Sequence, residues 1–192
     1  NYCIASPIPV KIVEMATLNT KQKDLSVSWD EYHRSIERLA LKVHESGLQF
    51  DHILCLARGG LRIGDVFSRL FKLPLSVLSV SSYRGSAGQE QGQIQIGGSV
   101  ASVEKNLRGR VLLVDDLVDS GVTFKEVQPW LRHHYPEITE MKSAVIWVKS
   151  VSVVFPDFYL EYLEGAPWIH QPFEIYDTLS FEDIGVGSSD KH

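Results

Sequence analysis

Apolar positions follow a helical period between Ser28 and Gly47. They recur every three or four residues on one face, at Trp29, Tyr32, Ile36, Leu39, Ala40 and Val43. Ser28 and Glu31 have the spacing of a capping box, and Gly47 supplies a stop signal. The pattern predicts an amphipathic helix with both ends marked.

Short runs of branched apolar residues predict buried strands. They occupy residues 52–57, 74–80, 111–114, 142–150 and 158–163. Further helices are expected over about 61–71 and 122–134, the second kinked or split at Pro129. Near-continuous Val/Ile/Leu strands that alternate with helices are typical of a parallel sheet covered on both faces. The sequence therefore predicts an α/β fold in one domain, with a parallel twisted sheet flanked by helices.

Composition narrows the class of protein. The chain has 192 residues and a net charge of -5, which argues against a general nucleic-acid binder with a basic face. No apolar run approaches the ~18 residues of a membrane span. Cys3 and Cys55 are far apart and suggest no disulfide scaffold. We expect a reducing compartment, the cytoplasm, and neither a nucleic-acid partner nor a membrane span.

The two ends of the chain differ from its centre. Residues 1–27 lack the basic start and long apolar core of a signal peptide and are expected to form an extension. Met15 is a candidate native start, which would make residues 1–14 foreign to the natural protein. The domain is expected over 28–181, and the Gly/Ser-rich residues 182–192 are expected to form a flexible tail.

Polar residues follow the third predicted strand in an unusual order. Asp115 and Asp116 come first, then Asp119, then the turn Ser120–Thr123. A small-residue turn before a helix offers unpaired N–H groups to a phosphate, and Gly121 permits close approach. Carboxylates would repel a phosphate, so we expect them to face sugar hydroxyls or Mg²⁺. The stretch predicts a site for a ribose 5-phosphate at a strand end.

This order of residues resembles the signature of type I phosphoribosyltransferases, which bind phosphoribosyl pyrophosphate (PRPP). The resemblance implies that the ribose phosphate is bound by Asp115, Asp116, Val118, Asp119, Ser120, Gly121, Val122 and Thr123. It also implies that Asp115 and Asp116 hold Mg²⁺. The alternative of a phospho-acceptor receiver domain would place the acid pair after its first strand, whereas here a βα unit and another strand come first.

Two further segments resemble parts of the same family. "LARGG" looks like its pyrophosphate loop, made here by Ala57, Arg58, Gly59 and Gly60. Arg58 supplies a rigid fork for phosphate oxygens, and by resemblance the Ala57–Arg58 peptide is cis. The polar residues 82–98 have the place of the mobile catalytic loop. That loop begins Ser-Tyr in relatives that act on 6-oxopurines, and its first residues here are Ser82, Tyr83 and Arg84.

The segment "APWIHQPFE" resembles the base-binding hood of bacterial xanthine-guanine phosphoribosyltransferases, expected at about 151–176. The resemblance implies that Trp168 stacks on the purine and that backbone at Ile169 meets its 2-position. It also implies that Lys149 donates to the oxygen at C6 and that Glu174 helps hold a second Mg²⁺. His170 stands where such relatives tend to carry an acid, which leaves the choice among guanine, xanthine and hypoxanthine open.

The resemblance implies a reaction of purine salvage. The phosphoribosyl group passes from PRPP to a 6-oxopurine, and Arg58 receives the pyrophosphate. Asp119 is either the general base or only an acceptor for the N7–H group. A homo-oligomer, dimer or tetramer, is implied as well. Two alternatives are a phosphoribosyltransferase for another nucleobase, which would lack the Trp-Ile hood, and a regulator that senses nucleotide or PRPP, a class that often lacks the pyrophosphate loop or acid pair.

Overall fold

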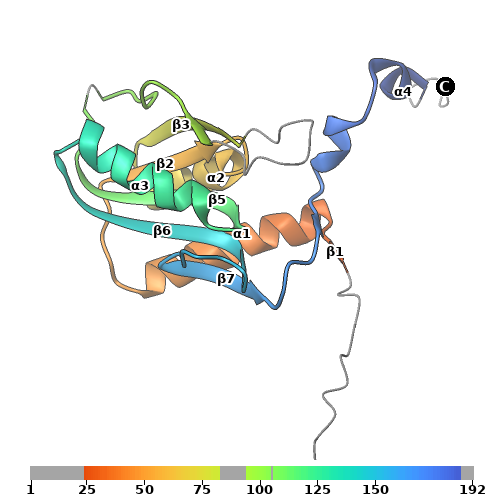
Figure 1. Cartoon of the computed structure of the whole chain (residues 1–192), viewed down its shortest axis with the longest axis horizontal. Coiled ribbons are helices and arrows are strands. Elements are labelled where there is room, and N and C mark those ends of the chain that lie inside the picture. Colours follow the sequence, from red (N-terminus) through yellow and green to blue (C-terminus); the bar gives the residue numbers. More distant parts are fainter. Residues whose placement is uncertain (1–23, 83–93, 105, 187–192) are drawn as a thin grey trace, which may run out of the picture.

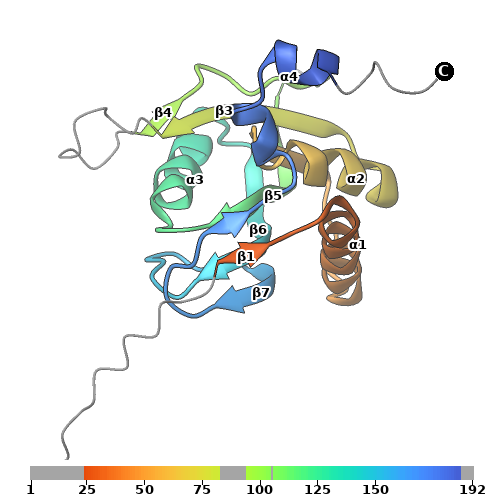
Figure 2. The same ribbon diagram turned by 90° about the vertical axis from the view of Figure 1, so that its right-hand side faces the viewer.

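A computed structural model describes residues 24–82, 94–104 and 106–186 of the chain. Its strands are β1 (Leu25–Ser26), β2 (His52–Ala57), β3 (Leu75–Ser82), β4 (Ile94–Ile96), β5 (Gly109–Val118), β6 (Ile138–Lys149), β7 (Phe158–Leu163) and β8 (Ile169–His170). Its helices are α1 (Trp29–Glu45), α2 (Leu61–Phe71), α3 (Val122–His134), the 3₁₀ helix η1 (Glu174–Asp177) and α4 (Phe181–Val186). A central sheet separates α1 and α2 on one face from α3 on the other (Figures 1 and 2).

The order of strands in the six-stranded sheet is β4-β3-β2-β5-β6-β7. All neighbours pair in parallel except β4, which is antiparallel to β3. From β2 the chain crosses to β3 on one side, and from β5 it crosses to β6 on the other. The centre of the sheet is therefore a topological switch point, where ligands of open α/β sheets bind beyond the carboxyl ends of the strands. This architecture confirms the predicted fold class.

Alternate residues of the central strands enter two separate cores. Ile53 and Cys55 pack with α1 and α2, whereas Leu54 and Leu56 pack with α3. Because both faces are covered, the strands need no polar face, which explains their continuous apolar runs. Burial raises the pKa of the free Cys55 thiol to about 12, so this thiol stays protonated and inert.

The predicted helices are largely confirmed. Ser28 Oγ accepts a hydrogen bond from Glu31 N (3.3 Å), and Glu31 Oε2 accepts one from Ser28 N (2.8 Å), which completes the capping box. Of the two outcomes predicted at Pro129, a kink or a split, the split is wrong, because α3 continues through it to His134. Pro129 lies on the exposed side, where the carbonyl that it leaves unpaired can turn toward solvent.

Regular secondary structure extends past the expected domain bounds at both ends. Leu25 and Ser26, placed by sequence in an N-terminal extension, form β1 and pair in parallel with Ile169 and His170 of β8. The hood thus includes a strand from the start of the chain. The helix α4 occupies Phe181–Val186 and so reaches into the segment, residues 182–192, that was expected to form a flexible tail. Met15, residues 1–23 and residues 187–192 lie outside the described residues.

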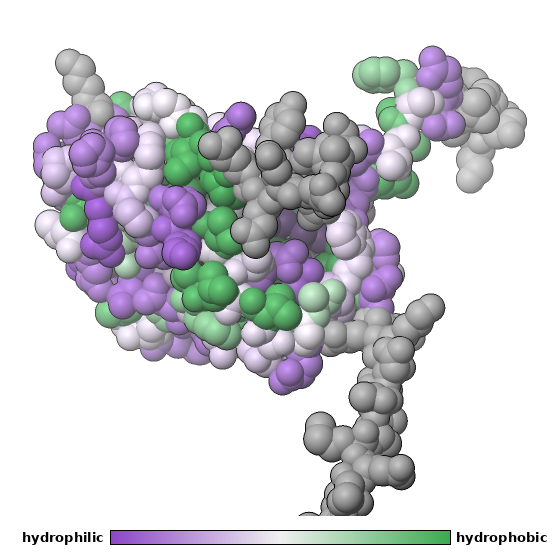
Figure 3. Space-filling model, in the orientation of Figure 1, coloured by the Kyte–Doolittle hydropathy of each residue, from purple (hydrophilic) through white to green (hydrophobic). Residues whose placement is uncertain are grey.

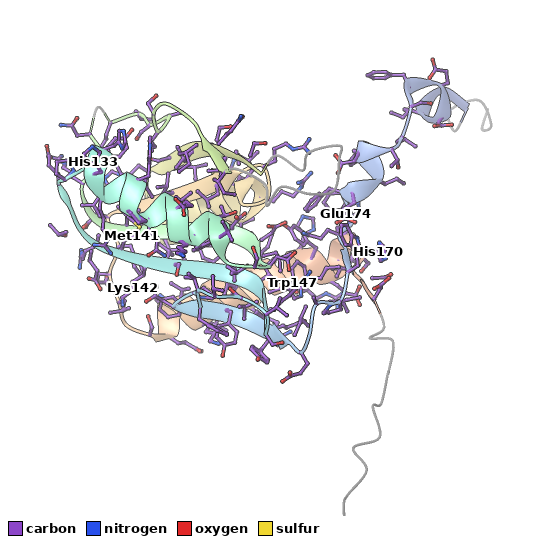
Figure 4. All side chains as sticks on the ribbon, viewed as in Figure 1. His133, Met141, Lys142, Trp147, His170 and Glu174 are labelled. Carbon is purple, nitrogen blue, oxygen red and sulfur yellow. The ribbon has the colours of Figure 1, made fainter. Side chains whose placement is uncertain are left out.

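The two ends of the sheet differ in what surrounds them. Labelled residues along β6 run from Met141 to Trp147 toward the end that holds His170 and Glu174 (Figure 4). Hydrophilic residues gather at the opposite end, where α3 ends and β6 begins (Figure 3). Among the described helices, none has the length and apolar content needed to cross a bilayer.

Candidate active site

A pocket of about 630 Å³ lies beyond the carboxyl ends of β2 and β5. The sequence-predicted residues that line it are Ala57, Arg58, Gly59, Asp115, Asp116, Thr123 and Glu174. Residues from three predicted segments, the pyrophosphate loop, the acid pair and the hood, are thus brought to one cavity. The lining of the pocket does not include Lys149, Trp168, Ile169 or Asp119.

The acid pair lies within β5, which runs on to Val118 instead of ending before the acids. Burial raises the pKa of Asp115 well above its usual range, and the neighbouring charge of Asp116 raises it further. Burial also raises the pKa of Asp116. Burial therefore favours the protonated acids, and a cation bound beside them would favour the ionised carboxylates instead. Neither carboxylate forms an ion pair with any residue in the described part of the chain.

This donor set fits a Mg²⁺ ion. Mg²⁺ prefers oxygen ligands and is usually held by one or two carboxylates together with waters and substrate phosphates. Asp115 and Asp116 supply such oxygens. Within the described residues, no group of three or more acidic, histidine or cysteine side chains could hold an ion unaided, so Glu174 does not complete a protein-only site.

Gly59 packs directly against the acid pair. A Cβ atom at this position would lie 2.5 Å from Asp116 Oδ1 and 2.8 Å from Asp115 Oδ1. Only glycine therefore lets the loop after β2 approach the acids of β5 so closely. The Ala57–Arg58 peptide is cis, as the resemblance implied. Arg58 itself is exposed and pairs with Asp177 of η1 (Nη2 to Oδ1, 3.3 Å).

The helices that begin at the site have no side-chain caps. α2 begins after Gly60 and α3 after Gly121, and neither start has a side-chain cap. Gly121 has φ +82, and a Cβ there would lie 2.5 Å from Ser152 Oγ. The first N–H groups of a helix have no partner within the helix and attract anions. At α2 the N–H groups of Gly60 and Leu61 already donate to Leu56 O (2.8 Å) and Arg58 O (3.1 Å). The start of α3 is therefore the better phosphate cradle, with Thr123 in the pocket lining.

Asp119 and Lys149 form an ion pair beside the α3 start. Lys149 Nζ lies 3.2 Å from Asp119 Oδ1, at the end of β6. The lysine side chain is 5% exposed and that of Asp119 is 50% exposed. The structure thus places the two residues that the sequence assigned to base binding and base catalysis in direct contact. Of the remaining turn residues, Val118 is buried, and Ser120 and Val122 are exposed.

The hood residues form a second group. Trp168 Nε1 donates to Glu174 Oε2 (3.3 Å), and the Trp168 residue is 46% exposed. Ile169 is buried in β8. His170 lies between two carboxylates, 3.5 Å from Asp24 Oδ2 and 3.9 Å from Glu174 Oε2. Glu174 therefore faces Trp168 and His170 as well as the pocket.

Sequence reasoning missed several residues of the site. The most consequential is Gln171, which is buried and donates from Nε2 to Asp116 Oδ2 (2.6 Å). Arg62, Phe173, Tyr176 and Asp177 also line the pocket. A signal for Gln171 was its place in the hood segment, one residue after His170. The loop residues Tyr83 and Arg84 lie outside the described residues, whereas Ser82 ends β3.

Comparisons with known proteins agree with this geometry. The sequence profile of the family described as "Phosphoribosyl transferase domain" matches residues 28–178. The chain is 28% identical to a xanthine-guanine phosphoribosyltransferase of Idiomarina loihiensis, over 80% of this chain and 89% of that protein.

Solved structures show the same fold. A purine phosphoribosyltransferase from Pyrococcus horikoshii superposes with a TM-score of 0.64 at 27% identity, covering 79% of this chain and 94% of that one. A xanthine-guanine-hypoxanthine phosphoribosyltransferase from Helicobacter pylori gives a TM-score of 0.64 at 21% identity, covering 85% and 99%. With the family profile spanning most of the chain and the site in place, the protein belongs to the phosphoribosyl transferase domain family.

Proposed function

We propose that the protein transfers the 5-phosphoribosyl group of PRPP to a 6-oxopurine and releases pyrophosphate. The observation that carries this proposal is the pocket lined jointly by the glycine loop after β2, the buried acid pair and the start of α3. The pocket offers a place for each part of PRPP: phosphate at a helix start, vicinal hydroxyls at carboxylates, and pyrophosphate at an arginine loop.

The 5-phosphate is expected to lie against the first turn of α3. Unpaired N–H groups after Gly121 and the hydroxyl groups of Ser120 and Thr123 donate to its oxygens. The ribose hydroxyls donate to Asp115 and Asp116. The cation that fits this acid pair supplies charge neutralisation for the departing pyrophosphate when bound. Glu174 is proposed to help hold a second such ion on the pyrophosphate side.

The transfer breaks the bond between C1 of the ribose and the pyrophosphate oxygen. Arg58 leaves Asp177 to receive the leaving oxygens, because a guanidinium binds phosphate better than it binds one exposed carboxylate. A ring nitrogen of the base then forms the new bond to C1. The base must lose a proton, which passes to the carboxylate of Asp119. The carboxylate lies one residue from the phosphate-binding turn, which suits a general base.

The base is proposed to be a 6-oxopurine because of Lys149. An ammonium group has three donors and no acceptor, so it can satisfy an oxygen at C6 but not an amine. The ion pair with Asp119 fixes the buried Nζ beside the proposed proton acceptor. Trp168 is proposed to stack on the ring, and backbone at Ile169 to meet the 2-position. The names of the Idiomarina and Pyrococcus relatives, xanthine-guanine and purine phosphoribosyltransferase, support the same class of substrate. Such a reaction would belong to purine salvage in the cytoplasm.

A comparison of bases in wild type and Lys149→Gln tests the proposal. We expect kcat/KM for guanine, xanthine or hypoxanthine to exceed that for adenine by up to about 10⁴, as for sites built around one specific hydrogen bond. An amide can both donate and accept, so the variant should lose 6-oxopurine activity and narrow the gap to adenine. Equal use of adenine and guanine by wild type, or unchanged ratios in the variant, would contradict Lys149 as the reader of the base.

A further inference from the structure

Arg62 lines the pocket but has no part in the proposed reaction. It lies in the first turn of α2, directly after the glycine loop, and lines the same cavity as Arg58, Asp115 and Asp116. Its guanidinium carbon lies 4.3 Å from the ring centroid of Phe173 and 5.3 Å from that of Trp29. The first ring belongs to the hood and the second to the start of α1.

The two rings constrain the guanidinium but use none of its donors. A cation–π contact is made with the face of the ring and supplies no hydrogen-bond acceptor atom, so the five N–H groups of a guanidinium still need acceptors. Among the residues that the structure describes, Arg62 forms no hydrogen bond and no ion pair. Arg58 differs, because it is largely exposed and already paired with Asp177. Arg62 is thus the better preorganised of the two cations.

The surroundings indicate which ligand these donors fit. A planar fork binds carboxylate or phosphate oxygens in pairs. The pocket is also lined by the carboxylates of Asp115 and Asp116. An anionic ligand of this cavity must therefore bind beside two acidic groups, which requires a cation between them. A pyrophosphate group, with several anionic oxygens and an affinity for the same cations, satisfies both conditions.

We propose that Arg62 is a second pyrophosphate-binding cation, held in orientation by Trp29 and Phe173. This inference rests on the proposed function, because it takes PRPP as the occupant of the pocket. Arg58 and Arg62 flank the start of α2 and grip the leaving group from two sides. The product nucleotide carries no pyrophosphate, so Arg62 contributes to the binding of PRPP and of free pyrophosphate but not to that of the nucleotide.

The experiment compares two ligands in three variants. Isothermal titration calorimetry, with Mg²⁺ present, measures the Kd of inorganic pyrophosphate and that of guanosine or inosine 5′-monophosphate. We expect Arg62→Gln to weaken pyrophosphate binding by about 10- to 100-fold, the loss typical of hydrogen bonds to a charged group. Nucleotide binding should change less than about twofold, within the usual effect of a surface substitution. Arg62→Lys keeps the charge but not the planar fork of donors, so its Kd for pyrophosphate should lie between those of wild type and Arg62→Gln.

Arg69→Gln is the matched control, since Arg69 lies in the last turn of the same helix and pairs with Asp65 (2.9 Å) away from the pocket. It should leave both affinities unchanged. If Arg62→Gln and Arg62→Lys weaken both ligands equally, Arg62 supports the hood instead of contacting pyrophosphate, and the inference is overturned. Unchanged pyrophosphate binding overturns it too. A wild-type chain that binds nucleotide but neither pyrophosphate nor PRPP would contradict the proposed function itself.

Discussion

Contacts between residues that are distant in sequence give this site its chemistry. Asp119 follows β5 and Lys149 ends β6, and their charged groups lie 3.2 Å apart. Gln171 of the hood donates to Asp116 of β5 at 2.6 Å. The first contact joins the proposed base-reading lysine to the proposed proton acceptor, and the second joins the hood to the acid pair.

The first residue-scale prediction concerns Asp119→Asn. If Asp119 takes the proton of the base, turnover should fall by on the order of 10²–10⁴ while PRPP affinity changes little. Asparagine can still accept a hydrogen bond through Oδ1, so a residue that only accepts a bond from N7–H would lose far less. Single-turnover rates and the Kd of PRPP separate the two roles. Near-normal turnover would reject the general base.

The second concerns Gln171→Met, which keeps the length of the side chain and removes the bond to Asp116. Because a hydrogen bond to a charged group contributes about 1.5–3 kcal/mol, PRPP affinity in the presence of Mg²⁺ should fall by roughly 10- to 100-fold. KM for the base should change less. Gln49→Met is the control, since Gln49 is exposed and its amide donates to Gly47 O at 3.4 Å, away from the pocket. An unchanged Kd for PRPP would show that Gln171 does not position Asp116.

Residues that are contiguous in sequence could be predicted, and their three-dimensional partners could not. Asp115 to Thr123 form one motif, and the glycine loop forms another, so each was identifiable from its order of residue types. Arg62 carries no local signal, and the place of Gln171 in the hood segment does not reveal its partner Asp116. Their importance depends on how β8 and α2 meet β5 and the hood, which is set by packing of the whole domain.

At the scale of elements, the starts of the helices distinguish the site from the scaffold. α1 begins with a complete capping box, whereas α2 and α3 begin at glycines without side-chain caps. The helices α1, α2 and α3 were predicted within a residue or two because their apolar patterns are strong. The two-residue strands β1 and β8 have no periodicity to detect, so the contribution of Leu25 and Ser26 to the hood could not be predicted.

A pair of glycine substitutions tests the start of α3. A methyl group added at Gly47 (φ +72) would have nothing within 4 Å, whereas one at Gly121 (φ +82) would meet Ser152 Oγ at 2.5 Å and Val154 N at 2.8 Å. Gly47→Ala should cost about 1–2 kcal/mol from the left-handed backbone alone. Gly121→Ala should cost roughly 1–3 kcal/mol more, because of overpacking. Urea unfolding measures the free energy of unfolding of both variants. Equal losses of stability would show that the loop around Ser152 can move aside without cost and would contradict the overpacking.

At the scale of the whole molecule, the switch point in strand order brings the pieces together. The carboxyl ends of the parallel strands lie at the same end of the sheet. The chain leaves β2 toward β3 and leaves β5 toward β6, in opposite directions, so the loops after β2 and β5 diverge and leave room for the pocket. The parallel sheet could be predicted from alternating helices and apolar strands. The antiparallel pairing of β4 could not, because a three-residue strand after a long polar segment gives no sign of its direction.

An ion pair links the amino ends of β2 and β5, at the end of the sheet opposite the pocket. Asp51 accepts hydrogen bonds from Arg110 N (2.8 Å), Nε (3.1 Å) and Nη2 (2.9 Å). These bonds lower the pKa of Asp51 from 3.8 to about 2. On acidification the unfolded chain takes up this proton first, so the contribution to stability is full above 3.8 and is lost as pH falls toward about 2.

The difference in unfolding free energy between wild type and Asp51→Asn should therefore be largest near neutral pH and shrink between about pH 4 and pH 2. The pair is partly exposed, so the difference should be modest and should decrease with added salt. Urea titrations at several pH values measure it. A difference that stays constant across this range would contradict the role of the ionised carboxylate.

The most direct test of the central claim is to identify the product. The purified protein is incubated with Mg²⁺, PRPP and guanine, xanthine or hypoxanthine, and the mixture is analysed by mass spectrometry. We predict the corresponding nucleoside 5′-monophosphate and pyrophosphate in equal amounts with at least one of these bases, and neither product when PRPP or the base is omitted. Binding of PRPP without any nucleotide formed from these bases would contradict the account and would indicate a sensor built on the same fold.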